Sequence, residues 1–188
     1  VNDTTDATGS AIYINGQIKH KENYPVINIY PSAELTSTGT IYGAGYAEWN
    51  IDGASITGVT AGIGIKSGKL NIFGGAQISC TGPNSAPTEG FSNGINASGA
   101  ALQIESNDGY AGDLEITINR ASLSSVNGYA IYEYANVGAD NIADSLCVRS
   151  FDIEDGTFTG GQSVNQGVLC VSETMSNANV LSITGGTF

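Results

Sequence analysis

The chain has 188 residues, of which 40% are hydrophobic and 13% charged, a composition that supports a folded domain and argues against a disordered chain. With 18 acidic against 6 basic residues the formal net charge is −12, which excludes a nucleic-acid partner because a phosphate backbone would repel such a chain. No apolar run approaches the roughly 20 residues that cross a bilayer, so we expect no membrane insertion.

A short phrase recurs six times along the chain and ends each time on a bulky apolar residue. The final residues are, in chain order, Leu35, Ile56, Ile78, Leu123, Phe158 and Phe188. The residues two positions earlier are all small: Ala33, Ala54, Ala76, Ala121, Gly156 and Gly186. A small residue at a fixed offset indicates the same tight, inward-facing corner in every repeat. The repeat is therefore a structural unit, and we expect one domain over residues 1–188.

Each phrase contains an alternating apolar pair, which predicts a strand with one face turned inward. The pairs are Ile27/Ile29, Trp49/Ile51, Leu70/Ile72, Ile116/Ile118, Phe151/Ile153 and Leu181/Ile183. Further upstream, a Gly followed by a short apolar run predicts another strand, with Ile12, Ile65, Leu102, Ile131 and Cys170 in register. Counting the short strand after the corner, each repeat has three strands. Stacked repeats of this kind predict an all-β parallel solenoid of about six coils.

Insertions between these strands differ in length from repeat to repeat. One follows the phrase at residues 80–98, and four lie between the first and second strands, at residues 15–25, 105–113, 133–149 and 172–179. Such insertions collect on one face of a repeat protein, and that face is often the binding face.

The phrases LNIFGGAQI, FDIEDGTF and LSITGGTF, with the upstream runs GSAIYI and GYAIYEY, resemble the coils of pectate-lyase-like right-handed parallel β-helix proteins. The resemblance is strongest to repetitive secreted or wall-attached bacterial surface proteins with ITGGTF-type repeats. It implies a single-stranded right-handed parallel β-helix in an extracellular or cell-surface protein. It selects no activity, because proteins of this fold class include polysaccharide lyases, pectin hydrolases, tailspikes, adhesins and carbohydrate-binding modules.

Residues suited to acid–base chemistry are scarce, and we assign no catalytic residue. The single histidine, His20, stands in an insertion, and neither Arg120 nor Arg149 has a carboxylate pair in the matching column of an adjacent repeat. The acidic run Asp152, Glu154 and Asp155 is interpreted as a solvated edge. An enzymatic role is therefore disfavoured, and the competing hypothesis is a calcium-dependent polysaccharide lyase, with Ca²⁺ as the one cofactor left open.

Tyrosines and acidic residues in the insertions favour a binding role. Aromatic rings stack on sugar faces, and carboxylates bond sugar hydroxyls. We expect a glycan-binding surface at the insertions of the fourth to sixth repeats, with the richest cluster of tyrosines and acidic residues in the fourth and fifth. Tyr13 and Tyr132 are expected at equivalent outward positions, in one column with Lys66, Gln103 and Val171. The candidate residues are Tyr110, Tyr134, Asp108, Asp113, Asp140, Asp144, Tyr13 and Tyr132. The alternative reading is that these tyrosines pack the insertions against the repeats.

The sequence therefore predicts a non-catalytic carbohydrate-binding or adhesive module that recognises a polysaccharide or a cell-surface glycan. A structural stalk or tailspike-type segment is a further alternative. Cys80, Cys147 and Cys170 are too few and too irregularly spaced for a disulfide framework or a zinc site, so buried or free thiols are expected. The start at Val1 and the stop at Phe188 indicate a fragment of a longer repetitive protein, whose end strands contact neighbouring domains or subunits.

Overall fold

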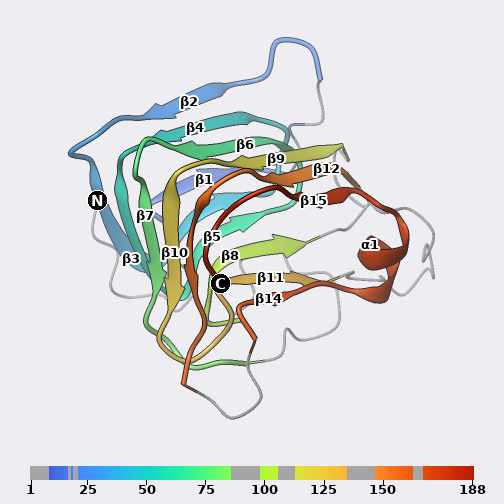
Figure 1. Cartoon of the computed structure of the whole chain (residues 1–188). Helices are drawn as coiled ribbons and strands as arrows, with labels where there is room; N and C mark the ends of the chain where they lie inside the picture. Colours follow the sequence, from blue (N-terminus) through green and yellow to red (C-terminus); the bar gives the residue numbers. More distant parts are fainter. Residues whose placement is uncertain are drawn as a thin grey trace.

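The computed structural model describes residues 9–16, 18, 21–85, 98–105, 113–134, 147–162 and 167–188. These residues form fifteen strands and one short helix (Figure 1). The strands are β1 (Ile12–Ile14), β2 (Val26–Ile29), β3 (Glu34–Gly43), β4 (Glu48–Asp52), β5 (Ser55–Ile65), β6 (Gly68–Phe73), β7 (Gln77–Cys80), β8 (Ala100–Glu105), β9 (Leu114–Ile118), β10 (Ala121–Ser125), β11 (Ile131–Tyr134), β12 (Val148–Ile153), β13 (Gly156–Thr159), β14 (Leu169–Cys170) and β15 (Leu181–Ile183). The helix is α1 (Glu173–Asn177).

The strands belong to two parallel sheets. Sheet B has six strands in the order β15-β12-β9-β6-β4-β2. Sheet A has nine strands and is curled into a half-barrel; its main path is β13-β10-β7-β5-β8-β11-β14, and β3 pairs with β5 and β1. From β2 to β7 the chain alternates between the sheets, so that residues one repeat apart become neighbours.

Strand β5 divides sheet A into two limbs. Its first residues, Ser55–Gly58, pair with β7, and its last residues, Ala61–Ile65, pair with β8. We name β7, β10, β13 and the first part of β5 the open limb. We name β8, β11, β14 and the last part of β5 the covered limb. The long strand β3 pairs with β5 along both parts and, through its own second half, with β1.

The predicted fold class, a single-stranded right-handed parallel β-helix of about six coils, is wrong. The described strands form two sheets, one of them a curled half-barrel. The prediction assumed that a corner separates the last strand of one repeat from the first strand of the next. In β3 and in β5 these two expected strands are one continuous strand. Where a corner was expected in β3, the pairing with β5 shows only a register shift, between Ser37 and Gly39. The first and third strands of the expected repeats, which were predicted to form separate sheets, therefore belong to the same sheet A.

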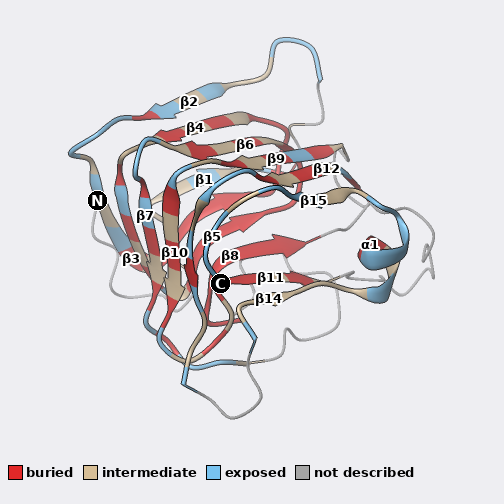
Figure 2. Cartoon of the chain, in the orientation of Figure 1, coloured by how far each residue is buried: buried red, intermediate tan, exposed pale blue. Residues whose placement is uncertain are grey.

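The predicted apolar column at the end of the phrase is confirmed as a ladder in sheet A. Leu35 pairs with Ile56, Ile56 with Ile78, Ile78 with Leu123 and Leu123 with Phe158. The alternating pairs form the matching ladders of sheet B, where Trp49, Ile51, Leu70, Ile72, Ile116, Ile118, Phe151 and Ile153 are all buried. Figure 2 shows the buried residues alternating along these strands. This alternation places the apolar core between the two sheets.

The small residues before the ladder pack into the corners as expected, with Ala54, Ala76 and Ala121 buried. One position earlier the backbone takes a positive φ in the first four repeats, at Ser32 (73°), Gly53 (61°), Gly75 (83°) and Arg120 (52°). Glycine tolerates this conformation, whereas a residue with a Cβ is strained in it. Arg120 therefore stands where the turn favours glycine.

The upstream register was predicted partly wrong. The ladder runs through Ile12, Ile41, Ile63, Leu102, Ile131 and Leu169. Ile63, not Ile65, pairs with Leu102, and a two-residue slip keeps the same face of the strand. Leu169, not Cys170, pairs with Ile131; this one-residue slip puts Cys170 on the opposite face, beside Tyr132. Lys66 consequently lies opposite Glu105 and not in the row of Tyr13.

Among the residues in the described ranges, no helix is long and apolar enough to span a membrane.

Candidate binding face and a buried polar cluster

The outward side of the open limb, together with the first residues of β3, presents two rows of side chains, one on each flank of the apolar ladder. The first row contains Glu34, Ser55, Gln77, Ser122 and Thr157, and the second contains Thr36, Thr57, Ser79, Ser124 and Thr159. All are exposed or half-exposed. Thr187, bridged to Thr157, extends the first row. We call these two rows the hydroxyl face.

The hydroxyl face is regular because its strands are in register. Neighbouring strands lie about 4.8 Å apart, and side chains on the same face of one strand recur every second residue. The hydroxyls of Thr57 and Ser79 bond to each other across two strands at 3.0 Å. Beyond the second row the backbone bonds continue to Thr81 and Val126, so the exposed valines Val59 and Val126 border the hydroxyls. The face thus repeats hydroxyl and methyl groups on a strand lattice.

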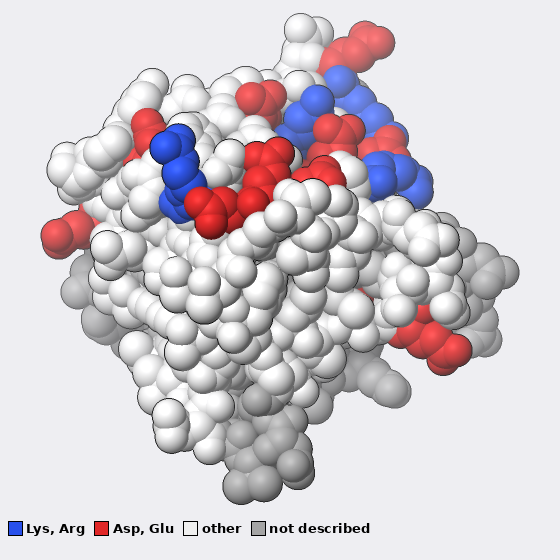
Figure 3. Space-filling model, viewed as in Figure 1, with Lys and Arg blue, Asp and Glu red and all other residues white. Residues whose placement is uncertain are grey.

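The hydroxyl face carries one charged residue, Glu34, at its β3 edge. In Figure 3 the charged side chains gather along the upper rim, over sheet B and its turns, while much of the remaining described surface is uncharged. Ion pairs there include Lys69–Glu115, whose Nζ and Oε2 lie 3.5 Å apart. A protein with a net charge of −12 therefore keeps one broad face nearly neutral.

The outward side of sheet B is different although it is also polar. Asn71 donates to Asn50 at 2.8 Å and Asn50 donates to Asn28 at 3.1 Å, across three neighbouring strands. These amides are engaged with one another, whereas most of the hydroxyl face is turned to solvent.

The hydroxyl face was not predicted, although its signal is in the sequence. The columns on either side of the final apolar residue read Glu/Thr, Ser/Thr, Gln/Ser, Ser/Ser and Thr/Thr in successive repeats. The prediction used the apolar and small columns and passed over these flanking positions.

The predicted glycan site is only partly within the described residues. Tyr110, Asp108, Asp140 and Asp144 lie outside them, as does His20. Asp113 lies at the start of β9, where it forms ion pairs with Lys21 and with Arg149, the latter at 2.6 Å. Hydrogen bonds from Lys21 and Arg149 lower the pKa of the Asp113 carboxyl. Asp113 thus balances two cations of this edge.

Of the predicted tyrosines that the structure describes, Tyr132 and Tyr134 lie on β11 of the covered limb and Tyr13 lies on β1. Tyr132 stacks on Tyr129 and on Tyr134, with ring centroids 5.4 and 5.8 Å apart, so its ring faces are largely occupied. Tyr13 stacks on the buried Tyr42 at 5.4 Å and keeps 46% of its surface exposed. The structure therefore brings Tyr132 and Tyr134 together, as expected, but in a packed stack, and leaves Tyr13 as the more exposed ring.

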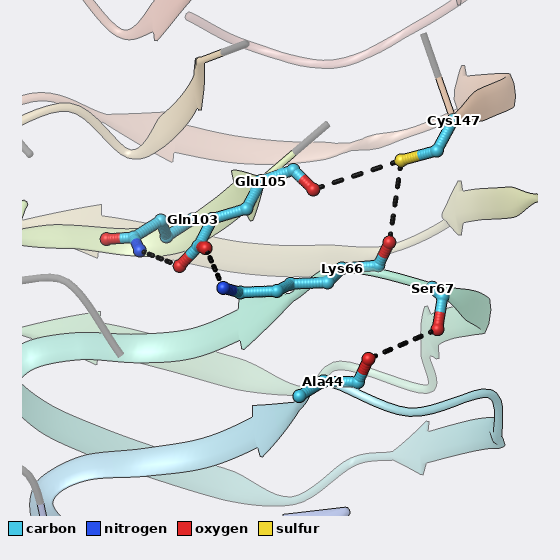
Figure 4. Close-up of polar contacts among 6 residues, drawn as sticks. All are labelled: Ala44, Lys66, Ser67, Gln103, Glu105 and Cys147. Atoms are coloured by element: carbon cyan, nitrogen blue, oxygen red, sulfur yellow. Dashed lines mark hydrogen bonds and ion pairs between the residues drawn. The ribbon is translucent and has the colours of Figure 1, made fainter. Parts of the chain in front are cut away.

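The covered limb also holds a buried polar cluster, drawn in Figure 4. Lys66 forms an ion pair with Glu105, and both side chains are completely buried. Gln103, also fully buried, donates from Nε2 to Glu105 Oε1 at 2.9 Å. Lys66 Nζ lies 5.5 Å from the centre of the Tyr42 ring. Burial raises the pKa of the Glu105 carboxyl, and the charge of Lys66 with hydrogen bonds from Lys66, Gln103 and Tyr134 opposes that rise.

This cluster does not meet the needs of a substrate-directed acid–base pair, because Lys66 and Glu105 expose no surface to a substrate. Other acidic candidates have local partners: Glu154 accepts from Asn119 at 2.7 Å, and Asp155 accepts from the amide of Gly156 at 2.8 Å. Within the described ranges no three His, Cys, Asp or Glu residues are grouped so that they could hold a metal ion.

The cysteines are free thiols, as expected. Cys147 is buried and its Sγ donates to the carbonyl oxygen of Lys66 at 3.5 Å, so the thiol lies against the backbone of the polar cluster (Figure 4). Burial raises the pKa of Cys80 and of Cys170, which keeps both thiols protonated at neutral pH.

Comparisons with protein-family models, with curated proteins and with solved structures found no match for this chain.

Proposed function

We propose that the chain is a non-catalytic carbohydrate-binding or adhesive module that contacts a neutral, ordered polysaccharide through its hydroxyl face. The observation that carries this proposal is the pair of in-register hydroxyl rows on the open limb. A Ser or Thr hydroxyl both donates and accepts hydrogen bonds, as a sugar hydroxyl does. A regular array of such groups complements a polymer whose own hydroxyls repeat.

The near absence of charge on the hydroxyl face selects a neutral ligand over an acidic one. Acidic polysaccharides, the substrates expected of a calcium-dependent lyase, would meet no cation within the two rows. The methyl groups of Thr57 and the exposed Val59 add apolar contacts of the kind that sugar rings make. We extend the proposal to an extracellular or cell-surface location, where such polymers are found.

The proposal is tested by co-sedimentation with insoluble neutral polysaccharides such as cellulose, chitin, mannan and starch. Ser79→Glu puts a carboxylate in the middle of the hydroxyl face. Ser182→Glu, the control, puts the same charge at an exposed position of β15 in sheet B. We expect Ser79→Glu to weaken binding at least tenfold, because a desolvated unpaired charge costs several times the 1.4 kcal/mol of a tenfold change. Ser182→Glu should bind as the unmodified chain does.

Three results would contradict the proposal. Equal loss of binding in both variants, or no binding to any neutral polysaccharide, would remove the hydroxyl face as the contact surface. Release of unsaturated sugar ends from an acidic polysaccharide would show a lyase. Binding should also change little between low and high salt, because screening acts on charges and the hydroxyl face carries almost none.

A further inference from the structure

The buried cluster on the covered limb joins three groups that together can form a covalent bond. Ile65 of β5 pairs with Ile104 of β8, so the next residues along the chain, Lys66 and Glu105, lie opposite each other. Gln103 lies two residues before Glu105 and therefore on the same face of β8, diagonal to Lys66. The Glu105 carboxyl contacts the Lys66 amine through Oε2 and the Gln103 amide nitrogen through Oε1 (Figure 4).

Two features set this cluster apart from a structural ion pair. The first is the bridging carboxyl, which touches both an amine and the nitrogen that would leave from an amide. The second is the Gln103 carbonyl oxygen Oε1, which is buried and accepts no hydrogen bond from any residue that the structure describes. A buried polar atom without a donor is destabilising. The cluster therefore places a destabilising, incompletely bonded amide, that of Gln103, next to a destabilising buried ion pair.

We propose that Lys66 and Gln103 form an intramolecular isopeptide bond, with Glu105 transferring the protons. The Glu105 carboxylate takes a proton from Lys66 Nζ at Oε2, and Nζ attacks Gln103 Cδ. The bond between Lys66 Nζ and Gln103 Cδ forms. The bond between Gln103 Cδ and Nε2 breaks as Glu105 Oε1 delivers a proton to Gln103 Nε2. Nε2 leaves as ammonia, and the second proton that Nζ loses as the new amide forms passes to the Glu105 carboxylate, where it remains. The reaction neither oxidises nor reduces any group and needs no co-reactant.

The site supplies what this reaction lacks in free solution. Fixing amine, amide and carboxyl on paired strands replaces an encounter between free groups by an intramolecular step. Complete burial excludes water, which would otherwise compete with the amine. The reaction also turns a buried ion pair into a neutral amide and a neutral carboxylic acid, and so removes the cost of keeping two charges away from water. The raised pKa of Glu105 agrees with a carboxyl that ends the reaction protonated.

The bond would tie β5 to β8 and close the chain segment that includes β6 and β7. It would lie at the C-terminal end of β5, several residues beyond the point where sheet A divides into its two limbs, and it does not depend on the proposed ligand.

The test is the intact mass of the purified, denatured chain. We expect a mass below that of the sequence by one ammonia, and a branched peptide joining Lys66 to Gln103 in tandem mass spectrometry after proteolysis. The full sequence mass would overturn the proposal. So would a loss of water, or an ammonia loss that maps to an Asn-Gly succinimide such as one at Asn127.

Matched variants separate the roles of the three residues. Lys66→Met, Gln103→Met and Glu105→Gln should each show their full sequence mass. Gln77→Met, which changes an exposed glutamine of the open limb, should keep the ammonia loss. An ammonia loss that persists in Gln103→Met would overturn the assignment. Where a cluster variant fails to fold, the branched peptide of the unmodified chain still decides the proposal.

Discussion

The two limbs of sheet A share strand β5, yet the outward side chains are buried on one limb and solvent-exposed on the other. On the covered limb the outward residues Lys66, Gln103 and Glu105 are completely buried and bonded to one another. On the open limb the outward residues are mostly hydroxyls and are exposed or half-exposed. The apolar ladder beneath is the same in kind, so the difference lies in what each face does: one holds the fold together, and the other is available for contact.

The comparison predicts its largest effect at the covered limb. Glu105→Ala should lower the free energy of unfolding by about 3–5 kcal/mol, the usual cost of removing one partner of a buried pair. Urea unfolding measures this loss. Glu34→Ala, which removes an exposed carboxylate of the hydroxyl face, is the control and should change stability by less than about 0.5 kcal/mol. A loss below about 1 kcal/mol for Glu105→Ala would show that the two faces do not differ in stability as described.

In the turn before β10, the stability of the protein should depend on the backbone conformation of Arg120 and not on its side chain. Arg120 has a φ of 52°, and its backbone accepts from Gly75 at 2.7 Å and donates to Asp155 at 2.9 Å. Arg120→Gly keeps both bonds and relieves the strain, so we expect a gain of about 1 kcal/mol. Ser122→Gly, two residues later in β10, should instead cost about 0.5–1 kcal/mol. Thermal unfolding distinguishes the two signs, and a loss in Arg120→Gly would refute the strain.

An ion pair that keeps solvent contact should matter far less than the buried one. The pKa of Asp113 is lowered from 3.8, so its stabilising effect is present above that pH and is lost as the pH falls through the lower pKa of the folded protein. We expect Asp113→Asn to cost less than about 1 kcal/mol at pH 7, because solvent screens a partly exposed pair. The difference from the unmodified chain should shrink towards pH 2 and in high salt. A difference that grows on acidification would contradict this sign.

The smallest effects are expected on the hydroxyl face itself. Thr57→Val and Ser79→Ala remove the two bonded hydroxyls and should each change the unfolding free energy by no more than about 0.5 kcal/mol, because both groups are partly solvated. Their effect should appear in polysaccharide co-sedimentation instead. A large loss of stability without loss of binding would assign the face a structural role.

The sequence was sufficient for the ladders but not for the sheets. Apolar alternation at Leu70/Ile72 or Phe151/Ile153 depends only on which face is buried, and the structure confirms it. Whether the chain bends after Leu35 depends on tertiary pairing. The Gly and Thr residues there are compatible with a corner, but β5 pairs with β3 along both of its parts and keeps β3 extended.

The functional features also differ in how far the sequence could predict them. The hydroxyl columns were present in the repeat and needed only to be read beside the apolar one. The contact of Lys66 with Glu105 was not visible, because these residues belong to strands separated by β6 and β7 and a register error of two residues hid their pairing. Tyr132 was correctly placed on an outward face, but its packing against Tyr129 follows from the fold and not from the repeat.

The position of β5 also constrains how the chain reaches its native state. This strand pairs with β3, β7 and β8, so the two limbs of sheet A cannot be joined to each other before β5 is in place. All of these pairings are parallel and join distant parts of the chain, which is the kind of topology that folds slowly. The residues Ile56 and Ile63, one in each limb, are therefore where the rate-limiting step of folding should be most sensitive to substitution, with φ-values well above those of β15 at the edge of sheet B.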